Sequence, residues 1–225
     1  MSDDTAEAVR LRHWSEQHAL LMALAIPGAL LDRAWIAAIA GGSFLGLIVR
    51  FRRQWTPSGQ FGAANAITLT RLLCVLAWLM GPELPDAWAA GLALAVLCAD
   101  GLDGWIARRL GSASEFGHCF DQEVDAFFFL ALCAILYGEG RLGAWALLPG
   151  ALRYGYVLFA KLARPPIGSF RGNRYTRSVG AAAVLAFTLC LLPVGALGVG
   201  AAIAASLGLC GSFLYSAWRL YRPLE

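Results

Sequence analysis

Eight long apolar blocks occupy most of this chain and restrict what it can fold into. They cover roughly residues 18–31, 34–49, 62–80, 87–107, 118–137, 142–162, 178–196 and 198–218. A helix needs about twenty predominantly apolar residues to cross a bilayer, and a chain in lipid must pair its backbone amides and carbonyls internally. The blocks therefore predict an all-α, polytopic membrane bundle.

The composition also indicates that lipid surrounds most of the chain. Of its 225 residues, 59% are hydrophobic and 15% are charged, and the mean hydropathy is +0.61. A soluble domain carries about a quarter charged residues. The last six blocks are predicted to be transmembrane helices. The first two are short and joined only by Asp32-Arg33, which leaves open a tight transmembrane hairpin or a re-entrant or interfacial pair.

The basic residues are unevenly distributed. Lys161 is the single lysine among the 18 basic residues, and clusters lie at 50–53 and 161–177. Cytoplasmic loops are enriched in Lys and Arg. Placing 50–53 in the cytoplasm puts the aspartate-rich segment 100–125 and the 161–177 stretch there too, and leaves only Arg33 and Arg141 on the opposite side. Since no separate basic domain is present, nucleic-acid binding is not expected.

Segment 100–125 holds the residues with the clearest chemistry. Along a helix with about 100° per residue, positions three and four apart share a face. One such face lies at the end of the fourth apolar block and carries Asp100, Asp103, Gly104, Ala107 and Arg108. Another lies at the beginning of the fifth block and carries Gly117, Asp121 and Asp125. Two helices joined by the turn 110–116 are therefore predicted to present four aspartates to each other. Glu123 falls off the second face and is assigned no contact with a bound ion.

Converging carboxylates repel one another unless a cation lies between them. Ionised side chains in membrane spans are costly and mark functional sites. Hard divalent cations bind oxygen ligands of this kind, and two ions about 4 Å apart recur in phosphoryl chemistry. Gly104 and Gly117 leave room for a ligand to approach the helices, and Arg108 offers a planar donor fork to a phosphate.

The spacing D-x2-D-G-x2-A-R-x8-G-x3-D-x3-D from Asp100 to Asp125 resembles the signature of the CDP-alcohol phosphotransferase family, with no gap or substitution. The run from Asn65 to Arg71 resembles the beginning of the family's first core helix. The resemblance covers residues 62–218 and implies a six-helix catalytic transmembrane core. Residues 1–61 would form a polar segment and an extra hydrophobic helix pair, and residues 219–225 a cytoplasmic tail.

The resemblance implies an enzyme of phospholipid biosynthesis. It would transfer the phosphatidyl group of a CDP-linked lipid, such as CDP-diacylglycerol, to a hydroxyl acceptor and release CMP. Asp125 would act as the general base. Two divalent cations, Mg²⁺ or Mn²⁺, would be bound by Asp100, Asp103, Asp121 and Asp125. The CDP pocket would be lined by Gly104, Ala107, Arg108 and Gly117, with Thr68 as a further candidate.

The resemblance also implies a location and partners. The chain would be integral to the inner or plasma membrane, in contact with membrane lipids, with its active site facing the cytoplasm. Members of the family often form homodimers. The N-terminal pair, residues 18–49, has no counterpart in the family's core and receives no role from the resemblance.

The acceptor does not follow from the resemblance. Members that use glycerol phosphate typically have Pro after the third aspartate and Lys after the fourth, where this chain has Gln122 and Ala126. The run typical of serine-using members is absent as well. A small alcohol or a polyol phosphate is therefore expected only as a class. Five arginines on the predicted active-site side are candidates to bind an anionic acceptor or lipid phosphates: Arg153, Arg164, Arg171, Arg174 and Arg177.

Two other functions are compatible with carboxylates in a membrane. A transporter or channel uses them along an ion path, but here they cluster at one face, with no acidic or helix-breaking counterpart in the second half of the chain. A non-catalytic scaffold with an acidic ion site is disfavoured by the intact motif. Metal-dependent release of CMP from CDP-diacylglycerol separates the enzyme from both alternatives.

Overall fold

The computed structural model describes residues 3–163 and 174–219, except for the side chains of residues 3–5, 103, 174–177 and 219. Within these residues the chain is helical and contains no strand. The expected all-α bundle is therefore confirmed. The longer helices are α1 (Asp3–Ala25), α2 (Ala34–Arg50), α3 (Ala63–Met80), α4 (Asp86–Arg109), α5 (Glu115–Gly138), α6 (Leu147–Ala163), α7 (Arg174–Leu189) and α8 (Ala196–Arg219). Two short 3-10 turns, η1 (Ile26–Leu30) and η2 (Ala144–Ala146), precede α2 and α6.

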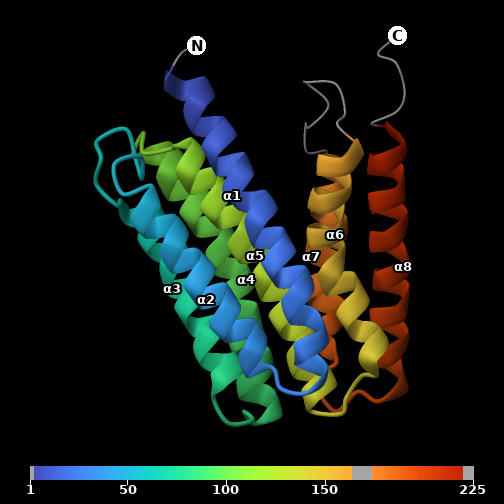
Figure 1. The fold of residues 1–225 in the computed structure, drawn as a ribbon. Helices are drawn as coiled ribbons and strands as arrows, with labels where there is room; N and C mark the ends of the chain where they lie inside the picture. The colour runs from blue at the N-terminus through green and yellow to red at the C-terminus, as the bar shows by residue number, and fades with distance from the viewer. Residues whose placement is uncertain (1–2, 164–173, 220–225) are drawn as a thin grey trace.

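The N-terminal pair forms an antiparallel hairpin that runs the height of the bundle (Figure 1). Helix α1 contacts α5 and α6, and α2 contacts α3. Helix α1 begins at Asp3, well before the apolar block expected from residue 18. The polar residues ahead of that block are helical because several of them pair with each other and with the bundle. For example, Glu16 lies 3.5 Å from Arg12 and 3.2 Å from Lys161.

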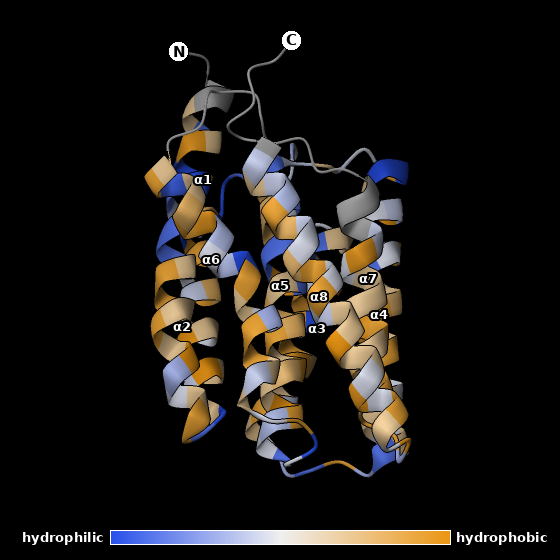
Figure 2. Cartoon of the chain, turned by 90° about the vertical axis from the view of Figure 1, so that its right-hand side faces the viewer, coloured by the Kyte–Doolittle hydropathy of each residue, from blue (hydrophilic) through white to orange (hydrophobic). Residues whose placement is uncertain are grey.

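In the part of the chain that the structure describes, three helices are long and apolar enough to cross a membrane: Ala63–Met80, Asp86–Arg109 and Ala196–Trp218. Their length and apolar composition are those of helices that span a bilayer. The sequence also predicted spans at α5, α6 and α7. Helix α5 is too rich in carboxylates along its first half to qualify, α6 has only 17 residues and α7 has only 16 residues. Figure 2 shows hydrophobic residues along the helices and hydrophilic ones concentrated toward the two ends.

The start of α1, the end of α8 and the loops after α2 and α4 lie at one end of the bundle, shown at the top of Figure 1. The loops after α1, α3, α5 and α7 lie at the other end. There Arg141 donates from Nη1 to the Leu191 carbonyl and from Nε to Glu139, both at 2.8 Å, and it contacts Asp86. The hydrogen bond with Asp86 raises the pKa of Arg141. This arginine thereby connects the first residue of α4 with the loop after α5 and the loop after α7.

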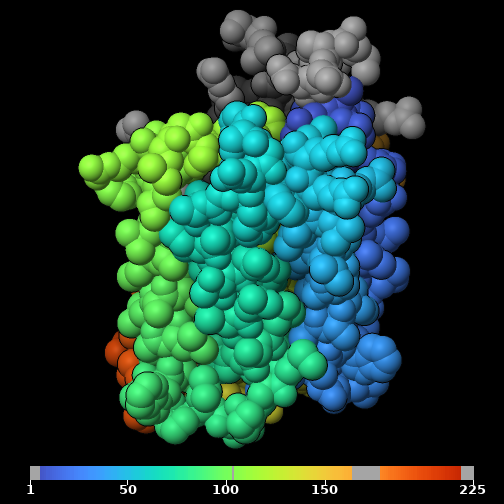
Figure 3. Space-filling view, turned by 90° about the vertical axis from the view of Figure 1, so that its left-hand side faces the viewer, coloured from blue at the N-terminus to red at the C-terminus, as the bar shows by residue number. Residues whose placement is uncertain are grey.

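Helix α5 is the central helix, in contact with α1, α3, α4, α6 and α7. Its apolar part is almost entirely buried. The ring of Phe44 on α2 packs edge-on against Phe120 and Phe127 of α5, with centroids 6.1 and 5.8 Å away. Helices α2 and α3 lie side by side on one face of the bundle (Figure 3). The position of α5 means that side chains on its different faces reach several other helices.

Local signals fix where the motif-bearing helices begin. The N-cap of α3 is Gly62, with φ of 78°, and a Cβ there would lie 2.9 Å from Cγ2 of Thr56. Helix α5 begins at a serine cap, since Ser114 Oγ accepts a hydrogen bond of 3.0 Å from the Gly117 amide, a preferred way to satisfy a free helix amide. Gly111, with φ of 61°, lies in the turn between α4 and α5. A residue with a Cβ rarely adopts such angles.

Candidate active site

Three of the four predicted aspartates come together where α4 and α5 face α3. One oxygen from each of Asp100, Asp121 and Asp125 lies within 4.8 Å of the others. Asp121 and Asp125 are one helical turn apart on α5, as their spacing requires, and Asp100 approaches from α4. Asp103 lies in α4, but its side chain is outside the described part of the chain.

A buried arginine from α3 lies among these carboxylates. Nη1 of Arg71 is 2.8 Å from Oδ1 of Asp121 and 3.6 Å from Oδ1 of Asp100, and Nη2 contacts Oδ1 of Asp125. The Arg71 side chain is only 3% exposed. Opposite charges at these distances stabilise the ionised carboxylates. Arg71 thus supplies the positive charge that the converging aspartates need.

The sequence predicts no role for Arg71 beyond its place at the end of the run 65–71, which resembles the start of the family's first core helix. The signal that identifies it is its position, an arginine inside an apolar block on the face that carries Asn65, Thr68 and Leu72. Charged residues inside spans face the bundle interior and find a partner there. The carboxylates that pair with Arg71 can be identified only when the packing of α3 against α5 is known.

The donor set fits a divalent cation. All three groups are carboxylates on neighbouring helices, and Oδ1 of Asp100 is buried without a hydrogen-bond partner. Hard ions such as Mg²⁺ bind oxygen ligands of this type, with water completing the coordination. A buried oxygen that no donor satisfies is costly, and a cation shared with Asp121 and Asp125 would remove that cost.

The two motif glycines lie against polar side chains. A Cβ at Gly104 would lie 3.3 Å from Nη1 of Arg108, so the guanidinium folds back over its own helix. A Cβ at Gly117 would lie 3.0 Å from Oδ1 of Asn65. The Asn65 amide is held by the carbonyls of Trp55 and Phe61, at 3.0 and 2.7 Å. Any larger residue at either glycine would displace a polar group beside the aspartates.

The two remaining candidates for the nucleotide pocket are Thr68 and Ala107. Thr68 is buried on α3, and its hydroxyl donates to the Ala64 carbonyl at 3.2 Å. Ala107 is half-buried on α4, between Gly104 and the exposed Arg108. The assignment of these residues to a nucleotide pocket stays a prediction.

One of the five acceptor-site arginines has a carboxylate partner on α5. Nη2 of Arg153 donates to Oε1 of Glu123 at 2.9 Å. Its charge is therefore balanced within the bundle, which makes it a weaker anion site than the sequence suggested. Arg164 and Arg171 lie outside the described residues, as do the side chains of Arg174 and Arg177.

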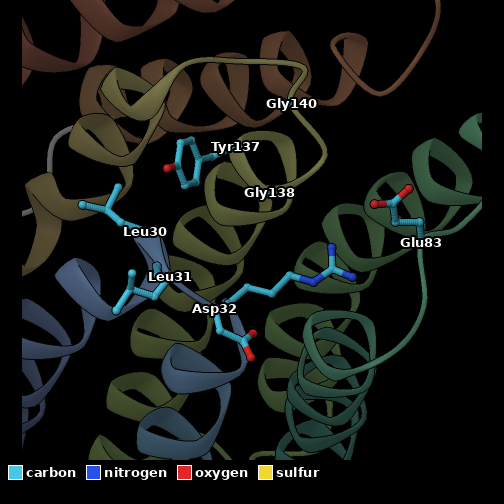
Figure 4. A pocket seen from close by; sticks show the side chains of 9 residues that line it. Leu30, Leu31, Asp32, Glu83, Tyr137, Gly138 and Gly140 are labelled. Carbon is cyan, nitrogen blue, oxygen red and sulfur yellow. The ribbon is translucent and has the colours of Figure 1, made fainter.

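A hollow of about 400 Å³ lies at the opposite end of the bundle, lined partly by Asp32, Glu83 and Tyr137 (Figure 4). Beside it, Nη2 of Arg33 donates to the Gly81 carbonyl at 2.9 Å. It contains none of the motif residues. The carboxylate cluster on α4 and α5, not this hollow, is the candidate active site.

Comparison with known proteins gives one family. A model of that family, described as CDP-alcohol phosphatidyltransferase, matches residues 61–212. Similar curated proteins include the CDP-diacylglycerol–glycerol-3-phosphate 3-phosphatidyltransferases of Salmonella typhimurium, 29% identical, and of Escherichia coli strain K12, 28% identical, each over 96 residues. The match covers 41% of this chain and spans about half (52%) of each relative. No solved structure matches the chain.

Proposed function

The chain belongs to the CDP-alcohol phosphatidyltransferase family, and from this we propose that it transfers the phosphatidyl group of CDP-diacylglycerol, or a related CDP-lipid, to a hydroxyl acceptor. CMP is the second product. The observation that carries the proposal is the convergence of Asp100, Asp121 and Asp125 within 4.8 Å at the signature motif. A transporter or a silent scaffold gives no reason for carboxylates at this spacing beside the motif residues Gly104, Arg108 and Gly117.

The proposed reaction is a single displacement at phosphorus. The acceptor oxygen forms a bond to the β-phosphorus, which carries the lipid, and the bond from that phosphorus to the bridging oxygen breaks. The electron pair of the broken bond leaves with CMP. The acceptor proton passes to the Asp125 carboxylate during the attack, because a carboxylate is too weak a base to ionise an alcohol beforehand.

Each motif residue has a proposed part. Asp100, Asp103, Asp121 and Asp125 hold two divalent cations, Mg²⁺ or Mn²⁺. When bound, these ions would neutralise the pyrophosphate and the charge developing on CMP. The guanidinium of Arg108 would bind a phosphate oxygen pair. Gly104, Ala107, Gly117 and Thr68 would shape the space for the nucleotide.

The proposed acceptor class is a small alcohol or a polyol phosphate. The printed names of the relatives make glycerol 3-phosphate the first acceptor to test. Two residues argue against this acceptor. Gln122, which is exposed, and Ala126, which is half-buried, occupy the positions where glycerol-phosphate members have Pro and Lys. We further propose a homodimer in the inner or plasma membrane, with the site facing the cytoplasm.

The test is release of CMP by the detergent-purified protein from CDP-diacylglycerol with Mg²⁺ or Mn²⁺. Serine, inositol, inositol phosphate, choline and phosphatidylglycerol should be compared with glycerol 3-phosphate as acceptors. Asp125→Asn should lower turnover at least about 100-fold, the usual contribution of a general base. Glu115→Gln, an exposed carboxylate at the start of the same helix, is the matched control and should stay near wild type. No CMP release with any acceptor, or near-normal turnover of Asp125→Asn, would contradict these assignments.

A further inference from the structure

The back of the catalytic helix carries a second buried carboxylate. Glu123 lies between Asp121 and Asp125 in the sequence, yet its side chain is 2% exposed and is hydrogen-bonded to Ser15 on α1 and Arg153 on α6. Its Oε1 accepts hydrogen bonds from Ser15 Oγ at 2.5 Å and from Arg153 Nη2 at 2.9 Å. The other oxygen, Oε2, is buried without a hydrogen-bond partner. A single oxygen atom of Glu123 therefore accepts both the hydrogen bond from α1 and the hydrogen bond from α6.

Helix α1 is itself fixed by polar and aromatic contacts. Nδ1 of His18 lies 2.8 Å from the Ser43 hydroxyl on α2, and the His18 ring stacks on Trp14 at 4.9 Å. Glu16 lies 3.2 Å from Nζ of Lys161 on α6. Ser15, between these residues, is thus presented to α5 from a helix that is held on two sides.

The geometry relates Glu123 to the aspartates through the rotation of α5. Positions two apart on a helix point in nearly opposite directions, at about 200°. Holding Glu123 against α1 and α6 therefore keeps Asp121 and Asp125 directed at α3 and α4. Functional side chains must stay within about 0.5 Å and 10–20° of their productive geometry, which a small rotation of α5 would exceed.

We propose that α1, which lies outside the family-matched residues 61–212, is a positioning element for the catalytic helix and acts through the Ser15–Glu123 hydrogen bond. The proposal rests on the function proposed above, because its effect is exerted on the carboxylates assigned to metal binding. Ser15 and Glu123 are positioning residues and touch neither substrate nor metal. The otherwise unexplained N-terminal hairpin thereby gains a role in catalysis.

The test compares two hydroxyl deletions in the full-length, detergent-purified chain. Ser15→Ala removes the hydrogen bond to α5, whereas Ser43→Ala removes a hydrogen bond between α1 and α2 that does not reach α5. Both should lower the unfolding temperature to a similar extent. Only Ser15→Ala should weaken Mn²⁺ binding, measured by electron paramagnetic resonance, by about tenfold, the lower end of the effects seen for residues that orient metal ligands.

Turnover gives a second readout. Ser15→Ala should lower kcat several-fold with little change in the KM for the CDP-lipid, and Ser15→Thr, which keeps the hydroxyl, should restore both kcat and Mn²⁺ affinity. Glu123→Gln keeps an acceptor oxygen for Ser15 and loses the charge that attracts Arg153. It should fall between wild type and Ser15→Ala, and it provides the comparison if Ser15→Ala does not fold.

Two results would overturn the proposal in different ways. Equal Mn²⁺ affinity and kcat for Ser15→Ala, Ser43→Ala and wild type would reduce the Ser15 contact to ordinary packing and leave the enzyme assignment intact. Absence of both Mn²⁺ binding and CMP release in the wild type would overturn the proposed function, and the positioning role with it.

Discussion

At the residue scale, the arginine among the carboxylates determines how the site behaves without a metal. Arg71 is buried and faces three aspartates. Removing one partner of a buried ion pair is strongly destabilising because the remaining charge is left uncompensated. The aspartates are partly exposed, with side-chain exposures of 24 to 42%, so solvent screens part of their repulsion.

We therefore expect Arg71→Met to destabilise the metal-free protein by about 1–3 kcal/mol, below the full cost of a broken buried pair. A bound divalent ion would replace the lost positive charge, so Mn²⁺ should recover most of the loss. Thermal unfolding in detergent, with EDTA and with Mn²⁺, measures both effects. Arg108→Met removes an exposed arginine of the same motif and should leave metal-free stability near wild type. A loss for Arg71→Met that Mn²⁺ does not relieve would contradict the charge-balancing role.

The sequence predicted one class of site residue and missed another. Helical periodicity alone brings Asp121 and Asp125 to one face, and a short turn brings Asp100 opposite them. The roles of Arg71 and Ser15 depend on contacts made 50 and 108 residues away in the chain. Such contacts follow from how helices pack, and no local spacing encodes them. The expectation that Glu123 points away from the aspartates agrees with its contacts, which are with α1 and α6.

At the scale of the elements, the close approach of α5 and α6 depends on one glycine. A Cβ at Gly150 would lie 2.9 Å from Cα of Leu130 and 3.2 Å from Sγ of Cys133. Backbone atoms cannot move aside as a flexible side chain can, so the helices must separate. Small residues permit such close packing of membrane helices.

Gly150→Ala should therefore destabilise the protein by about 1–3 kcal/mol, the usual cost of overpacking. Gly155→Ala on the same helix is the matched control, since a Cβ there meets nothing within 4 Å. The control should be neutral or stabilising by up to about 1 kcal/mol through helix propensity. Unfolding temperatures of the two variants in the same detergent measure the difference. Equal stability of the two would show that α5 and α6 tolerate a wider spacing.

Hydropathy located the helices better than it located their ends. The block expected from residue 18 belongs to a helix that begins at Asp3. Residues 3–17 are mostly polar, and the hydropathy pattern predicts only a polar segment there. They extend α1, and some of their polar groups contact other helices, as Glu16 does with Lys161. A hydropathy pattern predicts which residues prefer lipid. It does not predict which polar residues extend a helix and find partners on other helices.

At the scale of the whole molecule, the two ends of the bundle differ in charge. The arginines at 50–53 and 108–109 lie at the end of the bundle where α1 begins and α8 ends (Figure 1). Arg33 and Arg141 lie at the other end, and both are hydrogen-bonded to carbonyls there. The positive-inside rule assigns the first end to the cytoplasm, which is also the proposed side of the carboxylate site.

Lys161 makes this orientation testable without an added reporter, because it is the single lysine of the chain. It lies near the C-terminal end of α6, and its side chain is 48% exposed beside Glu16. A membrane-impermeant amine reagent should modify Lys161 in inverted vesicles and spare it in right-side-out vesicles. Peptide mapping by mass spectrometry distinguishes this site from the N-terminal amine.

Two variants control the labelling. Lys161→Arg keeps the positive charge and should abolish the modified peptide in both kinds of vesicle. Adding Glu83→Lys to that variant places a lysine in the loop between α3 and α4, at the opposite end of the bundle, and the pattern should invert. Modification of Lys161 in right-side-out vesicles alone would place the motif outside the cytoplasm. Since CDP-linked lipids and CMP would then have to be exchanged across the membrane, that result would weigh against the proposed reaction as well as the topology.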